Sequence, residues 1–173
     1  MTGGRVLSLY LVRHAQAEPR GPRWPDDSHR PLAGRGRQRF ASLLLDPAVR
    51  RASLDVVLTS PFVRAVQTAE MLAKARRSPL PVRVCLALEP GGRPEAVARA
   101  VARRPKGSAV ALVGHEPALS QFVAYLTGRP APIPFRKGGV WRLRVRTPVA
   151  AGSGRLVWAR WPGPSAVRVV MPS

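Results

Sequence analysis

The chain has very little cysteine and no long apolar run. Cys85 is the only cysteine among 173 residues, so an internal disulfide cannot form. We expect Cys85 to be a small buried thiol without a chemical role. No apolar run approaches the about 20 residues that cross a bilayer, and the N-terminus lacks the apolar segment and cleavage site of a signal peptide. We therefore expect a cytoplasmic protein that does not contact membranes.

Acidic residues and lysine are also scarce. Nine Asp and Glu residues stand against 29 Lys and Arg, which gives a net charge of +20, and the only lysines are Lys74, Lys106 and Lys137. A basic surface of this kind attracts phosphates, nucleic acid or acidic protein faces. The arginines are scattered along the chain instead of forming one basic tail. We therefore attribute the charge to a compositional bias and do not expect nucleic acid to be a partner.

Composition and spacing favour one α/β domain that spans residues 1–173. Hydrophobic residues make up 45% of the chain, which contains no internal repeat, low-complexity tract or linker. The apolar pattern predicts strands over residues 5–12, 54–58, 82–86 and 109–113, alternating with helices over residues 32–45, 62–75, 94–103 and 118–126. Such alternation indicates a three-layer domain in which helices flank a mostly parallel sheet.

The last third of the chain has a different pattern. Residues 140–146 alternate strictly between apolar and polar side chains, and residues 155–161 return across a turn at 152–154. This pattern predicts a C-terminal antiparallel hairpin at the edge of the sheet. Arg142, Arg144 and Arg146 would share one face, and arginine interleaved with tryptophan occurs on some nucleic-acid surfaces. Because half-buried strands alternate and edge strands carry charge against aggregation, we interpret these arginines as structural.

Residues suited to phosphate chemistry stand at the ends of three apolar runs. Arg13 and His14 end the first run, Arg64 follows the second after Ser-Pro, and His115 ends the third after a glycine. In open α/β sheets, ligands bind just beyond the carboxyl ends of the strands. We therefore predict that these four side chains converge on one phosphate site.

The four side chains also form a chemically complete set. A neutral imidazole can act as a nucleophile at cellular pH, and His14 is placed for that role. The guanidinium group of arginine matches the oxygens of a transferring phosphoryl group. We therefore expect Arg13 and Arg64 to stabilise the charge of that group, as an arginine clamp. His115 can donate a hydrogen bond to a remaining oxygen. No metal is needed in such a mechanism, and we expect no cofactor.

The same segments resemble the histidine phosphatase superfamily, and they occur in its order. The Arg-His-Gly motif of that family appears at residues 13–15 with Ala15 in place of glycine. Residues 60–69 resemble its second phosphate-binding segment, and residues 113–117 resemble its second-histidine segment. The resemblance implies a phosphoglycerate-mutase-like fold and a phosphorylated His14 intermediate.

Within that superfamily, the chain is most similar to the short SixA-type phosphohistidine phosphatases. Residues 27–32 resemble a loop of this subgroup in which an arginine helps to line the pocket, and this makes Arg30 a third, substrate-binding arginine. The chain has no room for the segments that cover the site in the larger sugar-phosphate mutases and phosphatases. An open pocket would suit a phosphorylated side chain on another protein.

The general acid is not determined by the sequence. Glu89, at the end of the third predicted strand, and Glu18, four residues after His14, are the two candidates. Glu89 could equally be an exposed turn residue. Glu18 could equally lie among the substrate-binding residues and offset local positive charge. If the substrate is phosphohistidine, a dedicated acid is less necessary, because the leaving nitrogen can be protonated before cleavage.

Other acidic residues near these segments fit structural roles. Asp26, Asp27 and His29 are crowded in a proline-rich loop without further ligands at metal-binding spacing, so we expect a solvated rim or a helix cap instead of a metal site. Glu116 precedes a predicted helix and is expected to complement the helix dipole.

The sequence therefore favours a metal-independent phosphatase that uses His14 and acts on phosphohistidine in a protein. A second hypothesis keeps this chemistry and changes the substrate to a small phosphate ester or a nucleotide-derived phosphate. A third makes the chain a non-catalytic basic protein that binds phosphate or nucleic acid. The complete four-residue set argues against the third hypothesis, since a binding surface does not need a nucleophile.

Overall fold

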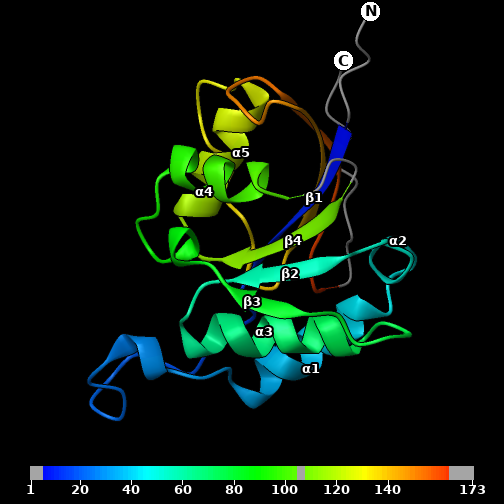
Figure 1. Cartoon of the computed structure of the whole chain (residues 1–173). Coiled ribbons are helices and arrows are strands. Elements are labelled where there is room, and N and C mark those ends of the chain that lie inside the picture. The colour runs from blue at the N-terminus through cyan, green and yellow to red at the C-terminus, as the bar shows by residue number, and fades with distance from the viewer. Residues whose placement is uncertain (1–5, 105–107, 164–173) are drawn as a thin grey trace, which may run out of the picture.

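Strands and helices alternate along most of the chain, which ends in two antiparallel strands (Figure 1). The computed structural model describes residues 6–104 and 108–163. The strands are β1 Val6–Arg13, β2 Val56–Thr59, β3 Val82–Val84, β4 Ala109–Gly114, β5 Val140–Arg146 and β6 Gly154–Arg160. The helices are α1 Gly34–Leu44, α2 Pro47–Arg50, α3 Val63–Lys74, α4 Pro94–Ala102 and α5 Ala118–Thr127, and two short 3-10 helices are η1 Asp27–His29 and η2 Leu86–Leu88.

The strands form a single mixed sheet in the order β3-β2-β4-β1-β5-β6. Strands β1, β2, β3 and β4 pair in parallel, whereas β5 is antiparallel to both β1 and β6. This arrangement confirms the α/β fold class with a mostly parallel sheet and antiparallel C-terminal strands. The predicted C-terminal antiparallel hairpin lies at one edge of the sheet, where β5 pairs with β1 and β6 is the edge strand.

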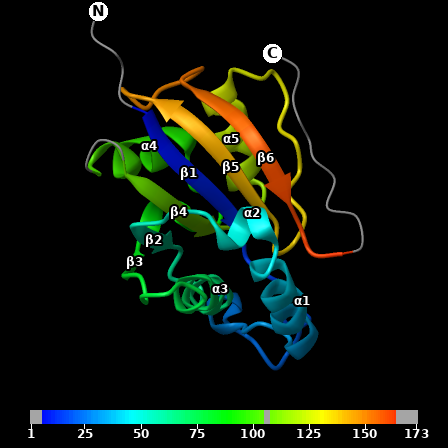
Figure 2. The same cartoon turned by 90° about the vertical axis from the view of Figure 1, so that its right-hand side faces the viewer.

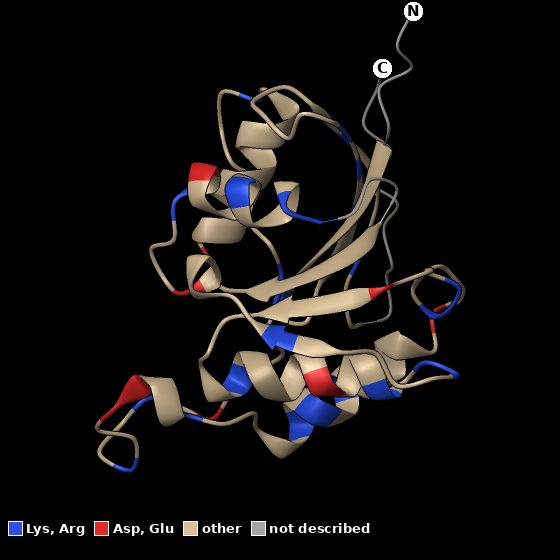
Figure 3. Ribbon diagram, viewed as in Figure 1, with Lys and Arg blue, Asp and Glu red and all other residues tan. Residues whose placement is uncertain are grey.

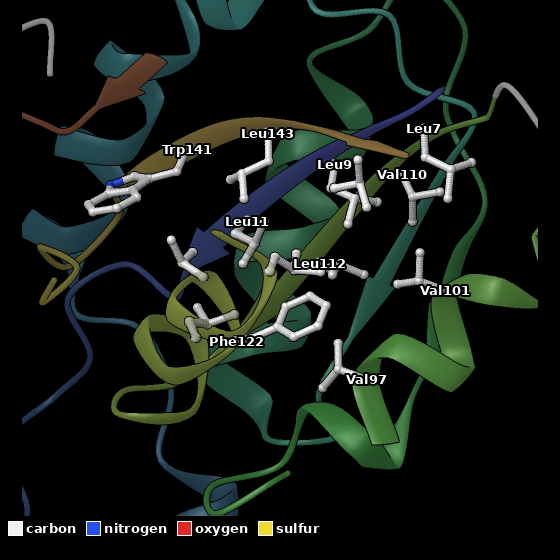
Figure 4. Packing of buried hydrophobic residues seen from close by; sticks show 14 of the residues in the cluster. Leu7, Leu9, Leu11, Val97, Val101, Val110, Leu112, Phe122, Trp141 and Leu143 are labelled. Carbon is white, nitrogen blue, oxygen red and sulfur yellow. The ribbon is translucent and has the colours of Figure 1, made fainter. Parts of the chain in front are cut away.

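Helices cover both faces of the sheet, with α4 and α5 on one face and α1 and α3 on the other (Figure 1). Alternate residues of β1 point to opposite faces. Leu9 and Leu11 pack with Leu112 and Phe122 in the core beneath α4 and α5, as Figure 4 shows. Tyr10 and Val12 belong to the second core, beneath α1 and α3. Because both faces of β1 are buried, the strand holds its carboxyl end at a fixed place in the sheet.

Several short elements were not predicted from the sequence. Asp46 accepts hydrogen bonds from the backbone N–H groups of Ala48 and Val49, and with Pro47 it starts the single turn of α2. The third strand is shorter than predicted because the backbone turns into η2. Cys85, at that junction, is half-buried, so the expectation of a fully buried thiol is wrong.

Positive charge is spread over the fold. Lys and Arg residues lie on helices of both layers and in several loops (Figure 3). On β5, Arg142 is half-buried whereas Arg144 and Arg146 are exposed, and all three alternate with buried apolar residues as predicted. No helix in the described part of the chain is long and apolar enough to cross a membrane.

Candidate active site

The ends of three adjacent strands bring the predicted residues together. Arg13 at the end of β1 is in register with Gly114 at the end of β4, and Thr59 of β2 is in register with Val113. The residues that follow these strands are therefore neighbours at one edge of the sheet. The ring centroids of His14 and His115 are 5.1 Å apart. This geometry agrees with the prediction of one site beyond the carboxyl ends of the strands.

The ring of His14 has a defined protonation pattern. Its Nδ1 lies 2.7 Å from the backbone carbonyl oxygen of Ala15. A carbonyl oxygen can only accept a hydrogen bond, so Nδ1 carries the proton and Nε2 holds the free lone pair. The side chain is buried, with 8% of the residue exposed. His14 therefore keeps the lone pair of Nε2 free of a proton.

Helix α3 fixes the backbone beside this histidine. The N–H of Ala15 donates to the hydroxyl of Thr68 at 3.1 Å, and that hydroxyl donates to the carbonyl of Arg64. The methyl group of Ala15 packs into the core with Leu32 and Phe40. Alanine at this position of the motif therefore contributes to the core, while its backbone supports His14.

Burial and nearby arginines keep both histidines neutral. Burial is the largest cause that lowers the pKa of His14 to about 4, and the charges of Arg64, Arg13 and Arg30 lower it further against the opposing hydrogen bond to Ala15. Burial, followed by the charge of His14, lowers the pKa of His115 to about 3. Both imidazoles are therefore uncharged at neutral pH, which a histidine nucleophile requires.

His115 is held by the segment that follows β2. Its Nε2 is 2.9 Å from the hydroxyl oxygen of Ser60, and the ring of Phe62 meets it edge-on with centroids 5.1 Å apart. Its Nδ1 is buried and has no hydrogen-bond partner among the described residues. Nε2 of His115 is thus held by Ser60, whereas Nδ1 forms no hydrogen bond with the described residues.

Asp27 holds two of the three arginines. Its side chain accepts a hydrogen bond from Arg64 at 2.8 Å and another from Nε of Arg30 at 2.8 Å. Its backbone carbonyl accepts a further bond from Arg64 at 2.6 Å. The hydrogen bond from Arg30 is the largest cause that lowers the pKa of Asp27, so this carboxylate is charged at neutral pH. The solvated rim expected for Asp27 is therefore wrong, because the carboxylate orients the arginines of the site.

Asp26 and His29 lie at the rim of this loop. Asp26 caps η1 by accepting a hydrogen bond from the N–H of Ser28 at 2.9 Å. His29 is exposed and lies 3.7 Å from Asp26. No group of three or more His, Cys, Asp or Glu side chains able to hold a metal ion occurs within residues 6–104 and 108–163.

Arg13 approaches the site from the end of β1. One of its terminal nitrogens donates to the carbonyl of Phe135 at 2.6 Å. Burial lowers the pKa of Arg13, and the charge of Glu116 raises it by a smaller amount. The carboxylate oxygens of Glu116 accept hydrogen bonds from the N–H of Phe135 and the hydroxyl of Ser120. Glu116 stands just before α5, as expected for a residue that complements the dipole, and it also ties the residue 135 loop to that helix.

Three buried nitrogens at this edge lack hydrogen-bond partners among the described residues. They are Nε of Arg13, Nε of Arg64 and Nδ1 of His115. A buried donor without a partner destabilises a protein by far more than a satisfied one stabilises it. All three belong to side chains that surround His14. The arrangement is suited to an anion placed against the ring of this histidine.

Neither candidate acid is joined to the cluster through its carboxyl group. Glu18 contributes its backbone carbonyl, which accepts a hydrogen bond from Arg30 at 2.7 Å. Glu89 ends η2 and is half-buried. Among the described residues, neither carboxyl group takes part in a hydrogen bond or an ion pair. The position of the general acid therefore stays a hypothesis.

Comparison with known proteins agrees with this geometry. A sequence model of the histidine phosphatase superfamily (branch 1) matches residues 9–89, which include His14, Arg30 and Arg64. An uncharacterised protein of Picosynechococcus sp. is 34% identical over 120 residues, which are 67% of this chain and 70% of that protein.

Solved structures show the same fold. The protein histidine phosphatase SixA, solved with tungstate, superimposes with a TM-score of 0.77 at 24% identity and covers 90% of this chain and 97% of its own. Phosphoglycerate mutase from Plasmodium falciparum superimposes with a TM-score of 0.61 at 17% identity, over 94% of this chain and 98% of the mutase. The fold is thus phosphoglycerate-mutase-like. With the matching sequence segments, it follows that the chain belongs to branch 1 of the histidine phosphatase superfamily.

Proposed function

We propose that this protein is a phosphatase that forms a phosphohistidine on His14. The observation that carries the proposal is the state of that side chain, which is neutral, has its Nδ1 proton engaged by Ala15 and lies among arginines. Nε2 attacks phosphorus, the N–P bond forms, and the bond to the leaving group breaks with its electron pair. Water then attacks the phosphohistidine, which releases inorganic phosphate and restores the imidazole.

The arginines would stabilise the charge that develops during the transfer. Arg64 is 3% exposed and held at two points by Asp27, so its guanidinium is already oriented before a phosphate binds. Such preorganised donors act strongly where water is excluded. Arg13, with an unpartnered Nε, and His115, with an unpartnered Nδ1, supply further donors. These groups need no metal for this chemistry.

Phosphohistidine on another protein is the substrate class that we propose. The structural similarity to the protein histidine phosphatase SixA supports this choice. The unengaged carboxyl groups of Glu18 and Glu89 also support it, because an imidazole leaving group does not depend on a positioned acid as an alkoxide does. A small phosphate ester is the alternative, supported by the fold shared with a phosphoglycerate mutase. A cytoplasmic location would suit either substrate.

Removal of the nucleophile provides the first test. His14→Ala should reduce turnover of a phosphohistidine peptide by about 10⁴-fold or more, because it removes the imidazole that forms the covalent intermediate. Rapid quenching of the wild-type reaction should trap phosphate on the protein that is labile in acid and stable in base. His29→Ala, which changes an exposed histidine, is the matched control. Substantial hydrolysis by folded His14→Ala would remove His14 from this role.

The arginine clamp gives a second prediction. Arg64→Ala should lower kcat/KM by roughly 10²- to 10³-fold, since it removes a donor aimed at the phosphoryl oxygens. Arg144→Ala changes an exposed arginine on β5 and should leave kcat/KM nearly unchanged. Both variants are to be assayed below their melting temperatures. Equal losses would show that the site is elsewhere.

The pKa of His14 predicts how activity depends on pH. Because Nε2 is protonated only near pH 4, the ionisation of His14 should not reduce kcat/KM until the pH falls towards that value. Nitrogen-15 NMR of the imidazole rings should show His14 neutral at pH 6 with its proton on Nδ1. Titration of His14 near pH 6.5, or a proton on Nε2, would contradict the proposed nucleophile.

The same pKa values affect stability in a defined window. In the unfolded chain, His14 and His115 take up protons near the ordinary pKa of about 6.5, whereas in the folded protein they do so near 4 and 3. Above pH 6.5 the two residues therefore do not change the free energy of unfolding. As the pH falls from 6.5 towards 4, the unfolded state binds more protons and stability decreases.

A fourth prediction separates the two substrate classes. Glu89→Gln and Glu18→Gln should each lower the rate only slightly with a phosphohistidine peptide. Each should lower the rate much more with an alkyl phosphate, because an unprotonated alkoxide is a poor leaving group. The ratio of the two losses is measured without metal and in the presence of a chelator. A large and equal loss on both substrates from either change would make that glutamate obligatory and favour the small phosphate ester.

A further inference from the structure

A second cationic cavity lies on the sheet face that carries Tyr10, away from the His14 site. It has a volume of about 760 Å³ and lies between β1, β5, β6 and the turn of α2. The described helices leave β5 and β6 uncovered on this face beyond α2, as Figure 2 shows. None of the residues that line the cavity belongs to the His14 site. Its size is within the range of small-molecule sites.

The side chains that line the cavity carry more positive than negative charge. Arg51, Arg142 and Arg160 line it, and Asp46 is the only acidic residue in the lining. Asp46 is already engaged, because one oxygen caps α2 and the other lies 3.4 Å from Nε of Arg160. Arg51 and Arg142 form no ion pair with the described residues. The cavity therefore keeps a net positive charge that suits an anion.

Arg142 is the residue that distinguishes this cavity from ordinary surface charge. Its guanidinium lies 5.7 Å from the ring centroid of Tyr10, and its Nε is buried without a hydrogen-bond partner among the described residues. A solvated surface arginine has water for each N–H group, whereas a buried N–H without a partner is destabilising. Arg144, two residues along the same strand, is exposed. Arg142 lines the cavity, so the guanidinium nitrogens beyond the buried Nε are the groups that an acceptor in the cavity would meet.

Aromatic and hydroxyl groups complete the lining. Trp158 and Tyr10 lie with ring centroids 5.9 Å apart, and Arg160 lies 5.8 Å from the ring centroid of Trp158. Burial raises the pKa of Tyr10, against smaller opposing effects of Arg142 and Arg76, so its hydroxyl keeps its proton and can donate. An anion in the cavity would thus meet arginine forks, a hydroxyl donor and the half-buried surface of an indole.

We propose that this cavity binds a small organic anion with two or more phosphate groups. Arginine forks match phosphate oxygens in a bidentate manner, and Arg51 directly after α2, Arg142 of β5 and Arg160 of β6 line a space much larger than one phosphate ion. A strand of nucleic acid would instead use the exposed arginines along β5. The observations favour the smaller ligand, because Arg142 lines the cavity with Arg51 and Arg160, whereas the exposed Arg144 and Arg146 do not.

NMR on the full-length protein can observe the two sites separately. The probes are methylenediphosphonate and the β,γ-methylene analogue of ATP, whose P–C bonds resist a phosphatase, at constant ionic strength with a chelator. The indole N–H of Trp158, assigned with Trp158→Phe, reports on the cavity, and the ring nitrogens of His14 and His115 report on the other site. We expect a saturable shift at Trp158 with a dissociation constant distinct from that at the histidines.

Substitutions on β5 decide whether Arg142 is responsible. Arg142→Gln should weaken binding at Trp158 by about tenfold or more, because a charge-assisted hydrogen bond is lost. Arg142→Lys should have a smaller effect, since it keeps the charge and loses the fork. Arg144→Gln, the matched control, should change binding by less than about twofold. Tighter binding of the nucleotide analogue than of the diphosphonate would indicate that the site also holds a nucleotide base against Trp158.

Two results would overturn the proposal. One is a shift confined to the rings of His14 and His115, which would make the His14 site the place where both probes bind. The other is equal weakening by Arg142→Gln and Arg144→Gln, which would indicate diffuse attraction to an arginine-rich strand, as expected for a nucleic-acid surface. The backbone amide spectrum of each variant shows whether it is folded, and Arg142→Lys provides the test if Arg142→Gln is not.

Discussion

Repulsion among positive side chains is the constraint on which the His14 site depends. Three arginines and two imidazoles meet at one edge of the sheet, and each protonated imidazole would add charge to a buried cluster. The protein resolves this in two ways. Asp27 joins Arg30 and Arg64 through one carboxylate, and burial keeps both imidazoles neutral. The neutrality that a nucleophile requires is thus a consequence chiefly of burial, to which the charges of the neighbouring arginines add.

The sheet supplies the rigidity that such crowding requires. β1 is buried on both faces and pairs with β4 and β5, so Arg13 and His14 stand at the end of a strand that cannot shift without disturbing two cores. Helix α3 adds Arg64 from its first turn and holds the backbone of Ala15 through Thr68. Three separate elements therefore fix the positions of the nucleophile and the clamp before any phosphate arrives.

Features that depend on local pattern were predicted well from the sequence. The alternating apolar runs predicted the parallel strands, and strand ends predicted where Arg13, His14, Arg64 and His115 meet. The role of Asp27 was missed, because a carboxylate in a proline-rich loop gives no local sign that it will face an arginine 37 residues away. The strand that pairs with β5 was not predicted for the same reason, since the pairing of β5 with β1 is a long-range contact that residues 140–146 do not encode alone.

The location of Asp27 has an evolutionary consequence. His14 directly follows a strand that is buried on both faces, whereas the carboxylate that pairs with the arginines stands in η1 with 35% of its side chain exposed. Substitutions of Asp27 would change how Arg30 and Arg64 are held without removing a residue from either core. The arrangement of the arginines and the packing of the framework are therefore open to change almost independently of each other.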